Sequence, residues 1–376
     1  MRNKRLDVLR CIAVLLVLFF HGNILASFAR VGWAGVDLFF VLSGFLISGL
    51  LFSEYQKRGS VGFKRFFIRR GLKIYPAFYV FLLFTVVVEY GIHNLNGPAL
   101  YLREMFFVQN YVPSVWGHTW SLAVEEHFYI FLPILLLVLL RLFSNRENPF
   151  EMIPWIFVVI AVACPVFRAV SVCVGPPNYI WAYGATHERI DALFFGVLLG
   201  YLHHFRPEIL NKLLRPGWNR LTIALLSVSA LSLTYALPKL SVFFTTIGLS
   251  LVYLGFGGIM LLSLHVRGIL PSGLAHVIER IGDGFAFVGV YSYSIYLWHG
   301  GVGAWGPGLV RKALHIPVGE YLRFTIYFFG SLACGILMSR LIEYPVLRLR
   351  DRVFPAMQDR TGKCGDPNPS SFRTIT

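Results

Sequence analysis

The chain has 376 residues, of which 56% are hydrophobic and only 14% are charged, and its mean hydropathy is +0.64. Soluble domains carry about a quarter charged residues, so this composition excludes an ordinary soluble protein and favours one that crosses a membrane repeatedly. The formal net charge of +15 does not indicate a nucleic-acid partner, because the basic residues gather in alternate connecting segments, as the positive-inside rule requires. The five cysteines lack C-x-x-C or metal-type spacing, which argues against a disulfide framework or a metal site.

Apolar segments of near-spanning length recur along the chain and predict an all-α, polytopic membrane protein with about ten transmembrane helices. The basic N-terminus and first apolar run resemble a signal peptide, but Arg10 within the run favours a retained first helix. The predicted segments are 7–27, 33–52, 74–92, 119–141, 152–173, 187–205, 221–237, 240–264, 285–302 and 321–342.

Basic stretches fall on one predicted side of the membrane, at Arg2–Arg5, Lys57–Lys73, Arg206–Arg220 and Arg348–Lys363. This side is predicted to be cytoplasmic, with both chain termini on it. Residues 1–352 are expected to form the transmembrane domain, and residues 353–376 a cytoplasmic, disordered tail. Residues 93–118 form the longest predicted outer loop, whose aromatic residues suit an interfacial segment.

The first predicted helix contains RCIAVLLVLFFH, in which Arg10 and His21 lie eleven positions apart. At about 100° per residue the two side chains share a face, about 16 Å apart along the axis. A snorkelling arginine and a hydrogen-bonded core histidine would explain either residue alone. Because ionisable groups at membrane depth usually face protein or a water-filled cavity, the shared face favours a functional site.

The fourth predicted helix begins HTWSLAVEEHFY, where Ser121, Glu125 and Tyr129 repeat every four residues and share a face. Glu125 and a buried His21 are each predicted about 9 Å below the outer boundary, so we expect them to meet. His299, in YSYSIYLWHG of the ninth segment, is predicted at the same depth.

Each neighbouring polar residue also has a structural interpretation. Glu126 would be an interfacial charge, His299 beside Trp298 part of an aromatic belt, and Arg189 with Asp191 a structural ion pair near the outer boundary. The convergence of several ionisable clusters on one depth favours a site over a purely structural explanation.

A second candidate site lies in FKRFFIRRGLKIYP, before the third predicted helix. Arg70 and Lys73 share a helical face there, whereas Arg69 points elsewhere in the same basic group. Such a group often binds only lipid phosphates. Because Arg10 is predicted at the same level, these residues are also suited to an anionic ligand that enters from the cytosol. A ligand with phosphates at one end and a reactive group on a long arm, such as acyl-coenzyme A, has this shape.

These segments together resemble the acyltransferase-3 family of integral membrane acyltransferases, and the resemblance covers the chain to about residue 352. The family's Arg-x10-His signature corresponds to Arg10 and His21. The other matching motifs are GVDLFFVLSGFLISGLL, HTWSLAVEEHFYIFLP, YSYSIYLWHG and SRLIEYP. Two positions depart from the family pattern, since Lys73 replaces an arginine and His127 a glutamine.

The resemblance implies an O-acyltransferase of the bacterial cytoplasmic membrane that moves an acyl group, most often acetyl, from cytoplasmic acyl-CoA to a sugar hydroxyl outside. O-antigen, exopolysaccharide, capsule, a lipid-linked or periplasmic glucan and a small metabolite are alternative acceptors, and succinyl is an alternative acyl group. An appended esterase-like domain, a metal and a nucleic-acid partner are not expected. A transporter or flippase of an anionic or lipid-linked sugar is the alternative function.

Within this interpretation His21 is the general base and Glu125 orients it, as in catalytic triads. Direct transfer and an acyl-histidine intermediate both fit. The supporting residues are expected to be Ser121, Tyr129 and His299, and the acyl-CoA-binding residues Arg10, Arg70, Lys73 and Arg69.

Overall fold

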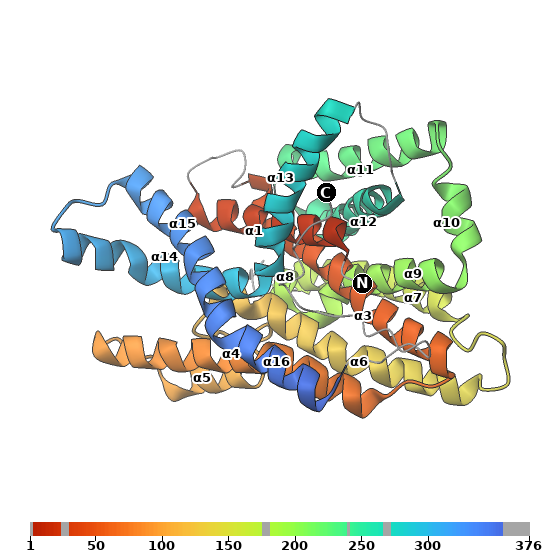
Figure 1. Cartoon of the computed structure of the whole chain (residues 1–376), viewed down its shortest axis with the longest axis horizontal. Helices are drawn as coiled ribbons and strands as arrows, with labels where there is room; N and C mark the ends of the chain where they lie inside the picture. Colours follow the sequence, from red (N-terminus) through yellow and green to blue (C-terminus); the bar gives the residue numbers. More distant parts are fainter. Residues whose placement is uncertain (1–2, 24–29, 175–180, 239–240, 266–271, 356–376) are drawn as a thin grey trace.

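The computed structural model describes residues 3–23, 30–174, 181–238, 241–265 and 272–355, and these residues form helices without any strand (Figure 1). The helices in the first half are α1 (Lys4–Gly22), α3 (Gly35–Arg58), α4 (Phe63–Gly91), α5 (Pro98–Met105), α6 (Trp120–Leu142) and α7 (Ile153–Val174). Those in the second half are α8 (Trp181–Gly184), α9 (Thr186–Phe205), α10 (Pro207–Leu213), α11 (Trp218–Ala236), α12 (Leu249–His265), α13 (Ser272–Val290), α14 (Ser292–Leu314), α15 (Glu320–Met338) and α16 (Tyr344–Val353). Short π-helical segments, η3 (Phe244–Gly248) and η4 (Ser339–Glu343), precede α12 and α16.

Local sequence signals explain where several helices begin and end. The Asn3 side chain accepts a hydrogen bond from the Arg5 N–H and caps α1, and α1 ends at Asn23, whose φ of 50° is left-handed. Gly59, with φ of 69°, ends α3 in the same conformation, which glycine adopts without strain. Pro98 begins α5, where its missing N–H needs no partner.

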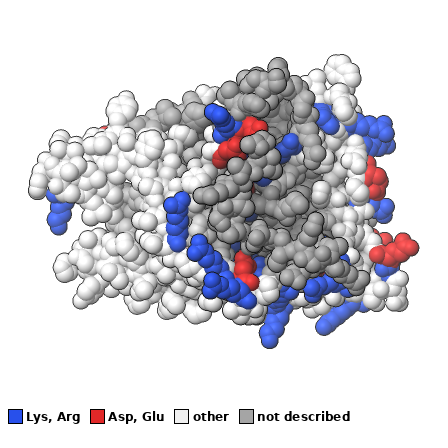
Figure 2. Space-filling view, in the orientation of Figure 1, with Lys and Arg blue, Asp and Glu red and all other residues white. Residues whose placement is uncertain are grey.

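The described helices include six that are long and apolar enough to cross a membrane, which supports the predicted all-α, polytopic architecture. They lie within Gly32–Arg58, Phe63–Gly91, Gly117–Leu142, Ile153–Val174, Phe244–His265 and Glu320–Val353. In Figure 2 the left half of the displayed face has few charged side chains, and most lysines and arginines lie toward the centre and right. The count of ten spans and the sides of the termini stay predictions.

Three predicted boundaries differ from the structure. The predicted segment 285–302 falls across α13 and α14, because the helix is interrupted at Tyr291. The last predicted segment continues past residue 342 through η4 into α16. The predicted loop 93–118 contains the helix α5 and a 3-10 turn, Gly117–Thr119. Of the predicted tail, residues from 356 onward lie outside the described residues.

Two glycines bring α3 and α9 into close contact. A Cβ on Gly44 would collide with the Leu193 carbonyl oxygen, and one on Gly196 with the Val41 carbonyl oxygen. Small residues of this kind let helix backbones approach closely in membrane proteins. The contact between α3 and α9 is accordingly among the most extensive between described helices.

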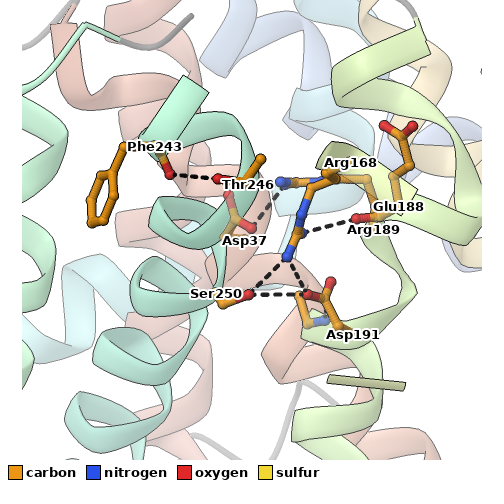
Figure 3. Close-up of polar contacts among 9 residues, drawn as sticks. Asp37, Arg168, Glu188, Arg189, Asp191, Phe243, Thr246 and Ser250 are labelled. Atoms are coloured by element: carbon orange, nitrogen blue, oxygen red, sulfur yellow. Dashed lines mark hydrogen bonds and ion pairs between the residues drawn. The ribbon is translucent and has the colours of Figure 1, made fainter. Parts of the chain in front are cut away.

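A buried network of ion pairs joins four helical segments (Figure 3). Arg189 on α9 donates to Asp37 on α3 at 2.8 Å, and each side chain is 1% exposed. Arg168 on α7 donates to Asp191 on α9 at 3.0 Å and to Ser250 on α12 at 2.8 Å. Arg189 and Asp191 therefore do not pair with each other, contrary to the prediction. Each pairs with a residue of a neighbouring helix, Asp37 and Arg168 respectively, and the spacing of residues within one helix does not reveal such partners.

Candidate active site

Two neighbouring cavities contain most of the predicted site residues. The arginine cavity, of about 100 Å³, is lined by Arg10, Arg70 and Lys73. The histidine cavity, of about 610 Å³, is lined by His21, His118 and His299. Val36 and Tyr296 line both cavities, so these two side chains form the wall between them.

The three cations of the arginine cavity differ in their interactions with the described residues. The Arg70 guanidinium lies 3.8 Å from the centroid of the Tyr129 ring, in a cation–π arrangement. Arg10 forms an ion pair with Asp7 at 3.4 Å. Lys73 makes no hydrogen bond and no ion pair with the residues that the structure describes. A partly buried ammonium without such a partner favours an anionic ligand.

Carboxylates balance these cations. Glu125 accepts hydrogen bonds from Ser43 Oγ at 2.9 Å and the Tyr129 hydroxyl at 2.6 Å, and lies 3.9 Å from Arg70. Glu126 accepts one from Tyr75 at 3.1 Å. With Glu343, three carboxylates line the same cavity as the three cations, so its formal net charge is zero.

Glu343 is a cavity residue that sequence reasoning missed, although SRLIEYP contains it. It accepts hydrogen bonds from Ser294 at 3.0 Å and Ser339 at 2.8 Å. It ends the π-helical segment η4, a conformation that is frequent at functional sites. The only sequence signal for Glu343 is that SRLIEYP matches a family motif, because no helical periodicity marks a π-helical turn.

The predicted binding residue Arg69 lies apart from the cavity. Its guanidinium donates to Asp351 Oδ1 at 2.9 Å and to the Phe354 carbonyl oxygen. It therefore holds α16 against α4. Adjacent positions on a helix point about 100° apart, which explains why Arg69 and Arg70 diverge. His127 likewise lines neither cavity, and its Nδ1 lies 2.6 Å from Thr186 Oγ1.

The three histidines form a cluster. The His299 ring centroid lies 4.9 Å from that of His21 and 4.5 Å from that of His118. His299 and His118 are buried, with exposed fractions of 1% and 8%. His21 is exposed, contrary to the expectation of a buried imidazole, because α1 ends one residue later. Sequence reasoning did not select His118, although it begins the HTWSLAVEEHFY motif.

Hydrogen bonds to backbone carbonyls define which ring nitrogen is the donor in each histidine. His21 Nδ1 lies 3.1 Å from the Val17 carbonyl oxygen, and His299 Nδ1 bonds the Tyr296 carbonyl. A carbonyl only accepts, so Nδ1 carries the proton in both rings and Nε2 is an acceptor. His118 bonds the Leu297 carbonyl through Nε2, at 3.2 Å, so its acceptor is Nδ1.

The structure separates Glu125 from His21, which corrects the expectation that they meet. His21 lines the histidine cavity, and Glu125 lines the arginine cavity with Arg70. Equal depth in the membrane fixes the height of two side chains but not the directions in which their helices face. Ser43 and Tyr129 hold the Glu125 carboxylate on the side of Arg70.

Ser121 contributes to the wall between the cavities. Its Oγ lies 2.6 Å from the Tyr296 hydroxyl, which donates to the His118 carbonyl oxygen at 2.6 Å. A hydroxyl has one proton, so the Ser121 hydroxyl is the donor to Tyr296. These bonds fix the Tyr296 side chain, which lines both cavities.

The segment before α6 is fixed by Glu104 on α5. Glu104 accepts hydrogen bonds from the Trp116 N–H at 2.9 Å and the Thr119 hydroxyl at 2.8 Å, on either side of His118. Burial raises the pKa of this carboxyl, and the two hydrogen bonds oppose the rise. Glu104 thus positions His118. It lies within residues 93–118, which the sequence predicts to be an outer loop at the membrane interface.

Comparisons with known proteins identify a family and several relatives. Residues 3–340 match the family described as an acyltransferase domain. The peptidoglycan O-acetyltransferase OatA of Listeria monocytogenes is 29% identical over 365 residues, covering 91% of this chain and 55% of OatA. The putative peptidoglycan O-acetyltransferase YrhL of Bacillus subtilis is 30% identical over 316 residues, covering 78% of this chain and 47% of YrhL.

A putative O-acetyltransferase of Staphylococcus aureus is also 30% identical, over 315 residues that cover 78% of this chain and 49% of the relative. The chain spans about half the length of the curated relatives it matches. No solved structure matches it. Because the family match covers nearly the whole described chain, the protein belongs to the acyltransferase-3 family of membrane acyltransferases.

Proposed function

We propose that this protein transfers an acetyl group from cytosolic acetyl-CoA to a hydroxyl of a glycan on the other side of the membrane. The observation that carries the proposal is the pair of cavities that share Val36 and Tyr296 in their linings. One cavity contains Lys73, which has no hydrogen bond or ion pair among the described residues, and the other contains imidazole acceptors. This arrangement suits a thioester donor that enters from one side and a hydroxyl acceptor that enters from the other.

In this proposal Arg10, Arg70 and Lys73 attract the anionic groups of the donor, and its acyl arm passes Tyr296. The acceptor hydroxyl gives its proton to His21 Nε2 while its oxygen bonds to the thioester carbonyl carbon. The carbon–sulfur bond then breaks, and the imidazolium protonates the leaving thiolate. The exposed position of His21 suits a residue that meets an acceptor from outside.

The names of the relatives favour a cell-wall glycan as acceptor over the O-antigen or exopolysaccharide expected from the sequence. OatA and YrhL are named for peptidoglycan. We therefore propose peptidoglycan glycan strands as the first acceptor to test, with acetyl as the transferred group.

The test uses the full chain in proteoliposomes, with acetyl-labelled acetyl-CoA on one side and soluble peptidoglycan glycan strands on the other. Label is expected in the glycan as an alkali-labile ester. His21→Ala should lower kcat by 10² to 10⁴-fold, as expected for loss of a general base. His265→Ala, on α12 and remote from both cavities, is the matched control and should retain activity.

Two results would contradict the proposal. Unchanged kcat in His21→Ala would remove His21 from the reaction. Movement of an anion or a lipid-linked sugar without consumption of acetyl-CoA would instead identify a transporter.

A further inference from the structure

Two buried polar atoms of residues that line the histidine cavity have no hydrogen-bond partner among the described residues. They are His299 Nε2 and the Tyr327 hydroxyl. His299 is 1% exposed and Tyr327 is 5% exposed. Leaving such groups unsatisfied is costly, so this buried pair favours a ligand that satisfies both.

The two atoms have complementary hydrogen-bonding roles. His299 Nδ1 carries its proton toward the Tyr296 carbonyl, so Nε2 accepts. The Tyr327 hydroxyl donates, and the ring centroids of the two residues are 6.4 Å apart. A ligand that fits both must donate one hydrogen bond and accept another through a small group, which is the pattern of an alcohol hydroxyl.

Glycines hold the Tyr327 ring in this position. A Cβ on Gly22 would lie 3.2 Å from Tyr327 Cε1, and one on Gly303 would lie 3.2 Å from Tyr327 Cδ2. The ring on α15 therefore packs between the end of α1 and the middle of α14. Gly22 follows His21 directly, so this packing places Tyr327 beside the histidine assigned to the acceptor hydroxyl.

Another part of the cavity lining suits a sugar ring. Trp33, Trp120 and Tyr183 line it, with ring centroids 5.6 Å apart for Trp33–Tyr183 and 5.7 Å for Trp120–Tyr183. The buried Arg189 guanidinium lies 4.9 Å from the Tyr183 centroid and fixes this wall. Rigid aromatic faces pack against the apolar C–H face of a sugar, while polar groups orient its hydroxyls.

We propose that His299 and Tyr327 form an acceptor subsite that binds a second polar group of the glycan, near the hydroxyl that is acetylated at His21. This inference rests on the proposed function and adds a feature of the acceptor, a second group that both donates and accepts a hydrogen bond, such as a hydroxyl or an acetamido group. The separation of 4.9 Å between the His21 and His299 ring centroids is what allows two nearby polar groups of one glycan to meet one imidazole each.

The test measures KM for peptidoglycan glycan strands and for acetyl-CoA in full-length variants. Tyr327→Phe keeps the ring between the two glycines and removes only the donor. It should raise KM for the glycan roughly three- to tenfold, the effect of one hydrogen bond, with KM for acetyl-CoA unchanged. Tyr321→Phe is the matched control on the same helix, since Tyr321 is 80% exposed and lines neither cavity.

A second variant keeps the inference testable if Tyr327→Phe folds poorly. His299→Leu should raise KM for the glycan, and His299→Gln should raise it less because a glutamine oxygen restores an acceptor. In the double variant Tyr327→Phe/His299→Leu, KM should rise by less than the product of the two single effects, because both residues bind one polar group.

The outcomes separate this subsite from the proposed function. A wild-type protein that acetylates no glycan would refute both. An active wild type with unchanged glycan KM in Tyr327→Phe would refute the subsite alone. A fall in kcat at unchanged glycan KM would also refute it, because the hydroxyl would then stabilise the transition state and not the bound acceptor.

Discussion

At the scale of single residues, the structure reassigns Glu125. Its carboxylate belongs to the arginine cavity, where Ser43, Tyr129 and Arg70 surround it. Its charge offsets that of Arg70, whereas His21 lines the other cavity. His21 and His299 are each oriented by a backbone carbonyl of their own helix, and His118 by the Leu297 carbonyl of α14.

Replacement of Glu125 tests this reassignment. Glu125→Gln should lower KM for acetyl-CoA severalfold, because the Arg70 guanidinium is released for the anionic donor, and should leave kcat within about fivefold. Steady-state kinetics with varied acetyl-CoA measure both constants, and Glu147→Gln, at an exposed position, is the control. A fall in kcat of about 10⁴-fold, as when the carboxylate of a catalytic triad is replaced, would restore the predicted His21–Glu125 pair.

At the scale of helices, α14 determines how closely the histidines pack. Tyr296 and His299 point from α14 toward the cavities, and Gly300 leaves room for the His118 ring. A Cβ at Gly300 would collide with His118 Cε1, whereas a Cβ at Gly308 on the same helix would meet no atom within 4 Å. The helix therefore offers one glycine that the site requires and one that it does not.

Alanine substitutions at these two glycines should differ sharply. Gly300→Ala should displace the His118 ring and lower kcat by about tenfold to a hundredfold, since small displacements in a site are costly. Gly308→Ala should retain activity and gain up to about 1 kcal/mol of stability from helix propensity. Acetyl transfer and thermal unfolding in detergent check both, and equal activity of the two variants would contradict the role of Gly300.

At the scale of the whole molecule, buried ion pairs lock the helices that carry the cavity walls. Asp37 follows Val36, a residue of the wall between the cavities, and its partner Arg189 packs against the aromatic wall. The Asp37–Arg189 and Arg168–Asp191 pairs therefore link the shape of the site to the packing of α3, α7 and α9.

A double-mutant cycle tests the buried pair. Asp37→Leu or Arg189→Met alone should cost about 3–5 kcal/mol in the free energy of unfolding, because each leaves an unpaired buried charge, and the double variant should cost less than either. Unfolding in detergent measures the three values. Arg206→Met is the control, since the Arg206–Glu208 pair is half exposed and should contribute less than about 1 kcal/mol. Additive losses would show that Asp37 and Arg189 are not coupled.

The sequence alone determined the helical membrane class and the family. Those features depend on local composition, on the length of apolar runs and on motifs such as Arg-x10-His, which the chain carries in linear order. It also placed Arg70 and Lys73 on one face and predicted that Arg10 lies near them, because helical spacing fixes directions along one axis.

Only the tertiary structure decided which ionisable groups share a cavity. Depth and periodicity leave the rotation of each helix open, and packing settles it, through close contacts such as Gly44 against α9 and Gly300 against His118. The same packing placed Glu125 beside Arg70, brought His118 to His299, and left the buried Tyr327 hydroxyl without a hydrogen-bond partner among the described residues. Contacts between helices distant in sequence have no linear signature, which is why a single sequence did not reveal them.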